Sequence, residues 1–336
     1  MKAILLDRAS EVSVAELPEP ILRDDDVLIR VGACGICASD LHMAAIKTGD
    51  LPYPLVPGHE VAGTVVLTGQ AVRTVRPGEH VVVQPTIACG ACHLCRRGYL
   101  NLCLEAQIIG LHRPGGFAQF VAVPSSNTYP TGKLPDGVAA CTEPLACALH
   151  GLLRLDPRPA DRILIFGAGT MGLFFLQLVR QQCAGPITVV DLQPQRLEVA
   201  RKLGADQVIE VDGSGGERPL EQQPHSFDCV VDATGSPDVI EAAFRCLIPG
   251  AKLLLLGSPP AAASITIRPR WIQRQDVTVV GAFSFGHEFA AALDLLQAGR
   301  VQTDPIVTHQ FALEDFPEAW EWASSGRDCI KVQVAP

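Results

Sequence analysis

The chain has 336 residues, of which 48% are hydrophobic and 19% are charged, and its formal net charge is −9. Because one hydrophobic core rarely serves a chain of this length, we expect two domains. The acidic balance argues against binding to nucleic acid or to an anionic membrane surface, since both require basic patches.

The first residues, 1–7, read as a strand and lack the apolar core of a signal peptide. The uninterrupted apolar runs, such as 145–149 and 253–256, are far too short to span a bilayer. We therefore predict a cytoplasmic protein without a membrane partner. Twelve cysteines in a reducing compartment indicate metal binding and core packing more than a disulfide framework.

The N-terminal part of the chain is expected to be rich in β-strands. Short or alternating apolar runs predict strands at 3–6, 27–31, 61–67, 80–83 and 117–123. Gly and Pro separate these runs, for example at 57–58, 77–78 and 115–116. Several short strands with such turn signals favour a barrel or a sandwich.

Four chemically active side chains lie within six positions of this region: Cys37, Ser39, Asp40 and His42. A thiolate is a strong zinc ligand. A hydroxyl nearby can pass a proton, which an imidazole can release to solvent. The alternative is an ordinary turn that happens to contain Cys and His. A second candidate ligand follows in the tripeptide of Gly58, His59 and Glu60.

A second metal site is predicted by four closely spaced cysteines, Cys89, Cys92, Cys95 and Cys103. Four thiolates complete a tetrahedral shell around zinc and leave no open position for a substrate. The site should therefore be structural, and its binding energy, of order 10 kcal/mol, is in effect local folding energy. His93 lies inside the cluster but is not needed to complete the shell.

From residue 161 the pattern changes to strands that alternate with helices. Strands are predicted at 162–166, 187–190, 207–211, 227–231, 252–256 and 277–280, and helices after 172, at 195–203 and at 237–247. This alternation predicts a parallel, doubly wound sheet. We expect a loop at 213–216. Helices at 287–298 and 316–324 and strands at 306–310 and 330–334 follow.

The first of these strands runs directly into a glycine motif, Gly167-x-Gly169-x-x-Gly172, that opens a helix. Such a loop lets backbone amides approach a pyrophosphate at a helix N-terminus. Asp191 ends the next strand, where a carboxylate can bind the adenosine ribose hydroxyls and repel a 2′-phosphate, so NAD is favoured over NADP. Arg196 is placed to reach a phosphate, so residual use of NADP stays open.

Together these motifs resemble the zinc-dependent medium-chain dehydrogenases, the superfamily of alcohol and polyol dehydrogenases that includes sorbitol dehydrogenase. The motifs occur in the family's order along essentially the whole chain. The resemblance implies a GroES-like, partly open barrel at 1–150 that binds zinc and carries catalysis. It also implies an NAD-binding Rossmann domain at 151–285 and a return of 286–336 to the first domain.

The resemblance also implies roles for individual residues. Cys37 and His59 would hold a catalytic zinc, and the third protein ligand would be Glu60 or Glu143. Asp40 would orient a zinc ligand, and Ser39 and His42 would carry the proton away. The cofactor would contact the glycine loop and its neighbours, namely Gly167, Gly169, Thr170, Met171, Gly172, Asp191, Arg196, Thr234, Gly257 and Phe283.

We therefore expect an oxidoreductase with two zinc ions per chain that transfers a hydride between NAD and a secondary alcohol or polyol. The open alternatives are a threonine-type or sugar-phosphate-type dehydrogenase and a catalytically silent binding relative. Met43 stands where polyol members often carry an aromatic residue, which leaves the shape of the substrate pocket open. A homo-oligomer, either dimer or tetramer, is expected.

Overall fold

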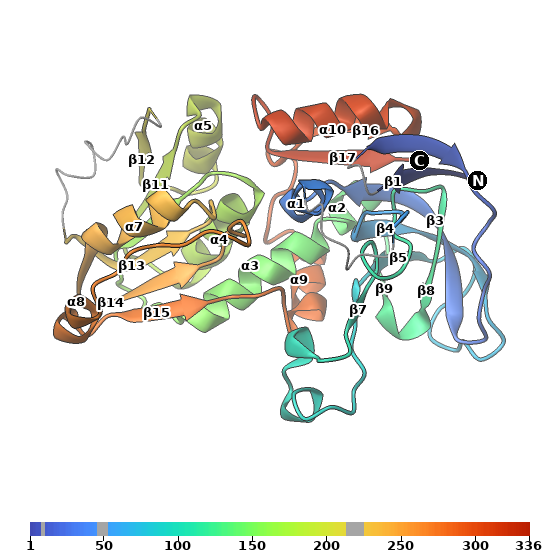
Figure 1. Ribbon diagram of the computed structural model, residues 1–336, viewed down its shortest axis with the longest axis horizontal. Coiled ribbons are helices and arrows are strands. Elements are labelled where there is room, and N and C mark those ends of the chain that lie inside the picture. Colours follow the sequence, from blue (N-terminus) through green and yellow to red (C-terminus); the bar gives the residue numbers. More distant parts are fainter. Residues whose placement is uncertain (8–10, 46–52, 213–224) are drawn as a thin grey trace. The chain divides into compact units, whose positions relative to one another are not determined.

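The computed structural model describes residues 1–7, 11–45, 53–212 and 225–336. The loop predicted at 213–216 lies outside these residues. Contacts between Cα atoms divide the chain into two compact units. The first consists of Met1–Glu143 and Gly286–Pro336, and the second of Pro144–Phe285 (Figure 1).

The first unit is built around a mostly antiparallel sheet in the order β16-β17-β3-β4-β5-β9, with β8 paired to β3. Its strands are β3 (Asp26–Gly35), β4 (Glu60–Thr68), β5 (His80–Val83), β8 (Phe120–Pro124), β9 (Thr128–Pro130), β16 (Val307–Ala312) and β17 (Lys331–Ala335). Small hairpins pair β1 (Lys2–Leu6) with β2 (Val12–Glu16) and β6 (Thr86–Ile87) with β7 (Gln107–Ile108).

Short helices complete this unit: α1 (Ala38–Ala45), α2 (Asp136–Ala139), α9 (Glu288–Gln297), α10 (Phe316–Ser325) and the 3₁₀ turns η1 (Cys95–Arg97), η2 (Leu100–Leu102), η3 (Ser125–Asn127) and η4 (Leu313–Asp315). A cluster of buried side chains from β3, β4, β5, β8 and β17 forms the core, together with Phe117 and Phe316. The C-terminal strand β17 therefore belongs to the same sheet as β3, and it brings residues from the end of the chain beside the N-terminal motifs.

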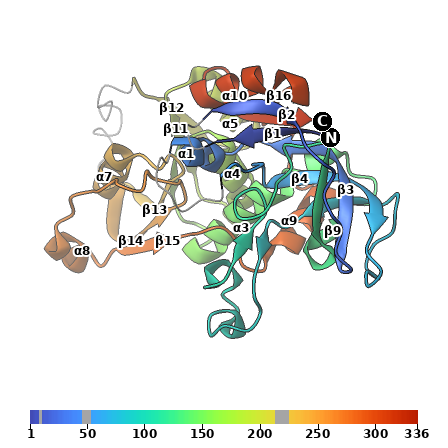
Figure 2. The same cartoon turned by 45° about the vertical axis from the view of Figure 1, so that its right-hand side comes forward.

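The second unit contains a six-stranded parallel sheet in the order β12-β11-β10-β13-β14-β15. The strands are β10 (Ile163–Phe166), β11 (Ile187–Asp191), β12 (Gln207–Glu210), β13 (Phe227–Asp232), β14 (Leu247–Leu255) and β15 (Thr278–Gly281). Figure 2 shows β13, β14 and β15 side by side. The helices of this unit include α4 (Thr170–Gln182), α5 (Pro194–Lys202), α7 (Pro237–Cys246) and α8 (Pro269–Gln275).

The strand order positions the site of this unit. The chain runs outward from β10 through β11 to β12, and then returns to build β13, β14 and β15 on the other side. The topological switch point therefore lies between β10 and β13, where doubly wound sheets bind their ligands at the carboxyl ends of the strands. The predicted doubly wound sheet is confirmed.

Among the helices that were not predicted from the sequence, α1 and a second helix, α3, carry candidate site residues. Residues Ala38–Ala45, which contain Ser39, Asp40 and His42, form α1. Thr142–Leu155 forms the 14-residue helix α3, although it contains Pro144 and Gly151. Pro144 lies in the first turn, where a missing N–H costs no helical hydrogen bond. Packing favours glycine at 151, because a Cβ atom there would lie 2.8 Å from the Leu256 side chain.

Cysteines outside the four-cysteine cluster behave largely as predicted. None of the twelve cysteines, all of which lie in the described residues, forms a disulfide, and six of those outside the cluster are buried: Cys34, Cys141, Cys183, Cys229, Cys246 and Cys329. Cys147, on α3, is only partly buried. Among the described residues, no helix combines the length and the apolar character needed to cross a membrane.

Candidate active site

Cys37 lies between the end of β3 and the start of α1, and the local fold fixes its backbone. The Cys37 N–H donates to Asp40 Oδ2 at 2.9 Å, and the Asp40 N–H donates to Cys37 O at 3.0 Å. This reciprocal pair caps the helix, because a side chain near the helix start accepts a bond from an otherwise free amide. Asp40 is fully buried.

His59 is positioned by the glycine before it and by Asp40. Gly58 has φ +95°, and a Cβ atom there would lie 2.8 Å from Cys34 Sγ, so both the backbone angle and the space require glycine. Asp40 Oδ1 lies 3.3 Å from His59 Nδ1. Burial alone would lower the pKa of His59, but the Asp40 carboxylate and the Cys37 thiolate outweigh it and raise this pKa well above 6.5.

Glu60 is the first residue of β4 and is paired with Gly35 of β3. A Cβ atom at Gly35 would lie 1.9 Å from Glu60 Oε2, so the carboxylate occupies the space that a side chain would otherwise fill. Candidate ligand atoms of Cys37, His59 and Glu60 all lie within 4.8 Å of one another. Thiolate, imidazole and carboxylate are the ligand types that zinc takes in catalytic sites.

Lys331 is a member of this site that was not predicted from the sequence. Its ammonium donates to both oxygens of Glu60, at 2.6 and 2.9 Å, although 271 positions separate the two residues. The Lys331 side chain is only 4% exposed. Burial would lower the pKa of Lys331, but Glu60 and Cys37 raise it, so the ammonium stays charged.

The remaining catalytic candidates occupy two helices. Ser39 and His42 are three positions apart on α1, which places both side chains on one helix face. Glu143 lies in the first turn of α3 and is 7% exposed. Among the described residues, Glu143 is not a member of the ligand group that contains Cys37, His59 and Glu60.

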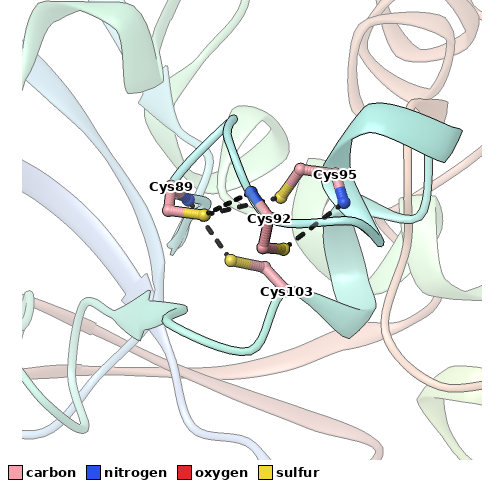
Figure 3. Close-up of side chains that lie close together, drawn as sticks. All are labelled: Cys89, Cys92, Cys95 and Cys103. Atoms are coloured by element: carbon pink, nitrogen blue, oxygen red, sulfur yellow. Dashed lines mark hydrogen bonds between the residues drawn. The ribbon is translucent and has the colours of Figure 1, made fainter.

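The four predicted structural cysteines are brought together in one loop (Figure 3). Their sulfur and backbone groups are already linked: the Cys89 N–H approaches Cys103 Sγ at 3.3 Å, and the Cys92 N–H approaches Cys89 Sγ at 3.3 Å. Backbone N–H groups of Cys95 and Leu104 lower the pKa of Cys92 to about 6. The loop therefore stabilises the Cys92 thiolate, which is the form that binds zinc, whereas burial and the neighbouring cysteine side chains raise the pKa of Cys95 to about 12. His93 is exposed and lies outside the group.

In the second unit, the glycine loop follows β10 and opens α4. Gly167 has φ +97°, and a Cβ atom at Gly172 would lie 1.8 Å from Gly167 O. Met171 and Thr170 form the first turn of α4. A helix N-terminus that follows such a loop is a place where a pyrophosphate can bind.

Asp191 ends β11 and is held beside this loop. Its Oδ2 atom accepts from the Ala168 N–H at 2.6 Å, and its Oδ1 atom accepts from the Gln193 N–H at 2.9 Å. Arg196 lies on α5, and its Nη1 atom would be 3.9 Å from a Cβ atom at Gly169. The carboxylate and the guanidinium therefore both lie close to the glycine loop.

Of two further predicted cofactor residues, Thr234 lies against the glycine loop and Gly257 lies against the backbone of Thr234 and Gly235. Thr234 Cγ2 would lie 3.0 Å from a Cβ atom at Gly167, and a Cβ atom at Gly257 would lie 2.2 Å from Gly235 N. Phe283, which follows β15, is 63% exposed.

Asp232, the last residue of β13, is a second residue that was missed from the sequence. Its Oδ1 atom accepts from Thr234 Oγ1 at 2.6 Å and from Thr234 N at 2.9 Å, and its side chain is fully buried. Desolvation raises the pKa of Asp232 above 3.8, although the hydrogen bonds that its carboxylate accepts act to lower this pKa. The sequence did contain a signal for this residue, because Asp232 directly follows a predicted strand and ligands of doubly wound sheets bind at the carboxyl ends of the strands.

Comparison with known proteins agrees with this arrangement. Residues 23–136 match the family "Alcohol dehydrogenase GroES-like domain", and residues 170–298 match "Zinc-binding dehydrogenase". D-arabinitol dehydrogenase 1 of Uromyces fabae is 33% identical over 100% of this chain and 97% of its own length.

Two solved structures have the same fold. One, from Sinorhizobium meliloti 1021, is described as a zinc-binding dehydrogenase bound to NADP; it covers 100% of this chain and 99% of its own, with TM-score 0.92 and 30% identity. The other, a short chain alcohol dehydrogenase from E. coli CFT073 complexed with NADH, has the same coverage, TM-score 0.91 and 27% identity. The predicted fold class, a Rossmann sheet with a GroES-like β domain, is confirmed, and the chain belongs to the zinc-containing superfamily of medium-chain alcohol and polyol dehydrogenases.

Proposed function

We propose that this protein is an NAD-dependent dehydrogenase that transfers a hydride between the cofactor and a secondary alcohol or polyol. The observation that carries the proposal is the convergence of Cys37, His59 and Glu60 within 4.8 Å. Three ligands of this kind leave one position open, as catalytic zinc sites require. When bound there, zinc would act as a Lewis acid on the substrate oxygen.

The protein groups around this site would position the substrate and move the proton. Asp40 would hold the His59 ring, since its carboxylate lies 3.3 Å from Nδ1. The Ser39 hydroxyl would accept the proton that the alcohol releases, and His42, on the same face of α1, would pass it to solvent. Glu60 or Glu143 would supply the third protein ligand.

NAD is the proposed cofactor because of Asp191. Its carboxylate accepts an N–H bond from Ala168 in the glycine loop and would repel a 2′-phosphate on the ribose. Arg196 would act in the opposite sense toward such a phosphate. We assign cofactor binding to 151–285, and catalysis to 1–150 with 286–336.

A substrate panel tests the proposal. Purified, zinc-loaded protein would be assayed for NADH formation with arabinitol, sorbitol, a vicinal diol, threonine, a sugar-alcohol phosphate, 2-propanol and ethanol. We expect the highest kcat/KM with a polyol or diol. Cys37→Ala is the matched control and should be inactive while remaining folded. A higher kcat/KM for ethanol than for every secondary alcohol and polyol would contradict the proposal.

A further inference from the structure

The Lys331 ammonium is fully engaged inside the first unit. It donates to Glu60 Oε1 at 2.6 Å, to Glu60 Oε2 at 2.9 Å and to Ile36 O at 3.1 Å. An ammonium has three protons to donate, so these contacts use its whole capacity. Its position is fixed in turn by β17, because neighbouring residues of that strand pair with Gly35 and Cys34 of β3.

The Glu60 carboxylate therefore has two possible cationic partners, the Lys331 ammonium and a metal ion bound by Cys37 and His59. Both of its oxygens bind Lys331, yet the same carboxylate belongs to the ligand group with Cys37 and His59. Its side chain has little room, because it is 1% exposed and lies against the backbone of Gly35, so the ammonium and a bound metal ion would compete for the same oxygens. A carboxylate that shares its electron pairs with a buried ammonium has less to donate to a metal ion.

We propose that Lys331 is a positioning residue that competes with the catalytic metal for the Glu60 carboxylate and so keeps Glu60 a weak, exchangeable ligand. The inference rests on the proposed function only in requiring that Cys37 and His59 hold a metal ion. A weak third ligand leaves room for the substrate oxygen. It also explains why a lysine is buried here at the cost of its hydration.

Removing the ammonium should strengthen the bond between Glu60 and the metal. In Lys331→Met the carboxylate would lose its ammonium partner, and the metal would no longer compete for its oxygens. We expect zinc release from the catalytic site to slow by about tenfold or more, within the range by which partners of metal ligands change affinity. With Co²⁺ in place of zinc, the visible spectrum should shift as Glu60 joins the coordination shell. Lys331→Arg should release zinc at nearly the wild-type rate.

The measurement is the rate of zinc transfer to a chromogenic chelator. The catalytic phase is identified as the phase that Cys37→Ala lacks, because the four-cysteine site remains in that variant. These readouts do not depend on the substrate, so a failed substrate panel and a failed metal measurement are separate results. An unchanged release rate and Co²⁺ spectrum in Lys331→Met would overturn the proposal.

A double-mutant cycle separates restraint of Glu60 from simple charge repulsion between Lys331 and the metal. In the Glu60→Gln background, adding Lys331→Met should change the release rate by less than about twofold. Equal slowing in both backgrounds would show that repulsion alone acts, and the proposal would be wrong. If Lys331→Met does not fold, Lys331→Gln replaces it, because its amide can still donate to the carboxylate. We expect slower release in that variant too, and an unchanged rate and spectrum there would also overturn the proposal.

Discussion

Gly172 provides a sharp test of the cofactor loop. A Cβ atom at this position would lie 1.8 Å from Gly167 O, whereas real Cβ atoms essentially never approach closer than 3.0 Å. The contacting atom belongs to the backbone, so rotation of a side chain cannot relieve the clash. In Gly172→Ala, the backbone at Gly167 and the start of α4 must therefore move apart by about 1 Å or more, which would displace the loop amides that we propose to bind the pyrophosphate.

The expected effect on stability combines two opposing contributions. Alanine should favour the helix by about 1 kcal/mol relative to glycine. Overpacking against the backbone should cost about 1–3 kcal/mol. The stability of the fold should therefore change little or fall, while the displaced loop should weaken NADH binding by about tenfold or more, or at least about 1.4 kcal/mol.

Fluorescence titration with NADH measures the affinity, and thermal unfolding measures the stability. Gly281→Ala is the matched control, because a Cβ atom at that position would have no atom within 4 Å and the φ of Gly281 is not left-handed. That variant should bind NADH like the wild type. If Gly172→Ala bound NADH within twofold of the wild type and melted at a higher temperature, the steric argument would be refuted.

Three further predictions concern the metals, the cofactor and the proton path. Elemental analysis should find two zinc ions per loaded chain; Cys92→Ser should lose one and unfold at a lower temperature, whereas Cys37→Ala should lose one, stay folded and be inactive. A single zinc ion in fully active enzyme would contradict the two sites. Asp191→Ser should raise the kcat/KM ratio of NADP to NAD by about tenfold, and a wild type that already uses both equally would refute the role of Asp191. Ser39→Ala should slow hydride transfer by about 10²-fold with unchanged NADH affinity, and His42→Ala should lose less; full activity of Ser39→Ala at neutral pH would exclude this proton path.

Features that are local in the sequence could be predicted well. The four clustered cysteines need only one loop to come together, so their spacing was sufficient to predict the group that the structure forms. The glycine motif is similarly local, since the strand before it and the helix after it are adjacent in the chain. Alternation of apolar strands with helices also predicted the parallel sheet, because each βαβ unit is a short-range pattern.

Local patterns were insufficient for two helices, α1 and α3. The residues after Cys37 have little apolar periodicity, and α1 depends on the reciprocal hydrogen bonds between Cys37 and Asp40. For α3, Pro144 and Gly151 are signals that usually break a helix. Tertiary packing and the tolerance of a first turn for proline outweighed those signals.

The order of residues supplies the chemical groups of this protein: the zinc-binding cysteines, the glycine loop and the carboxylate of Asp191. Which of these groups share a site depends on how distant strands pair. Lys331 reads in sequence as an ordinary charge at the start of a strand, and nothing local relates it to Glu60, 271 positions away. The pairing of β17 with β3 buries that charge beside the candidate metal ligands. A buried ammonium without a counter-charge would be too costly there, and the Glu60 carboxylate supplies that counter-charge.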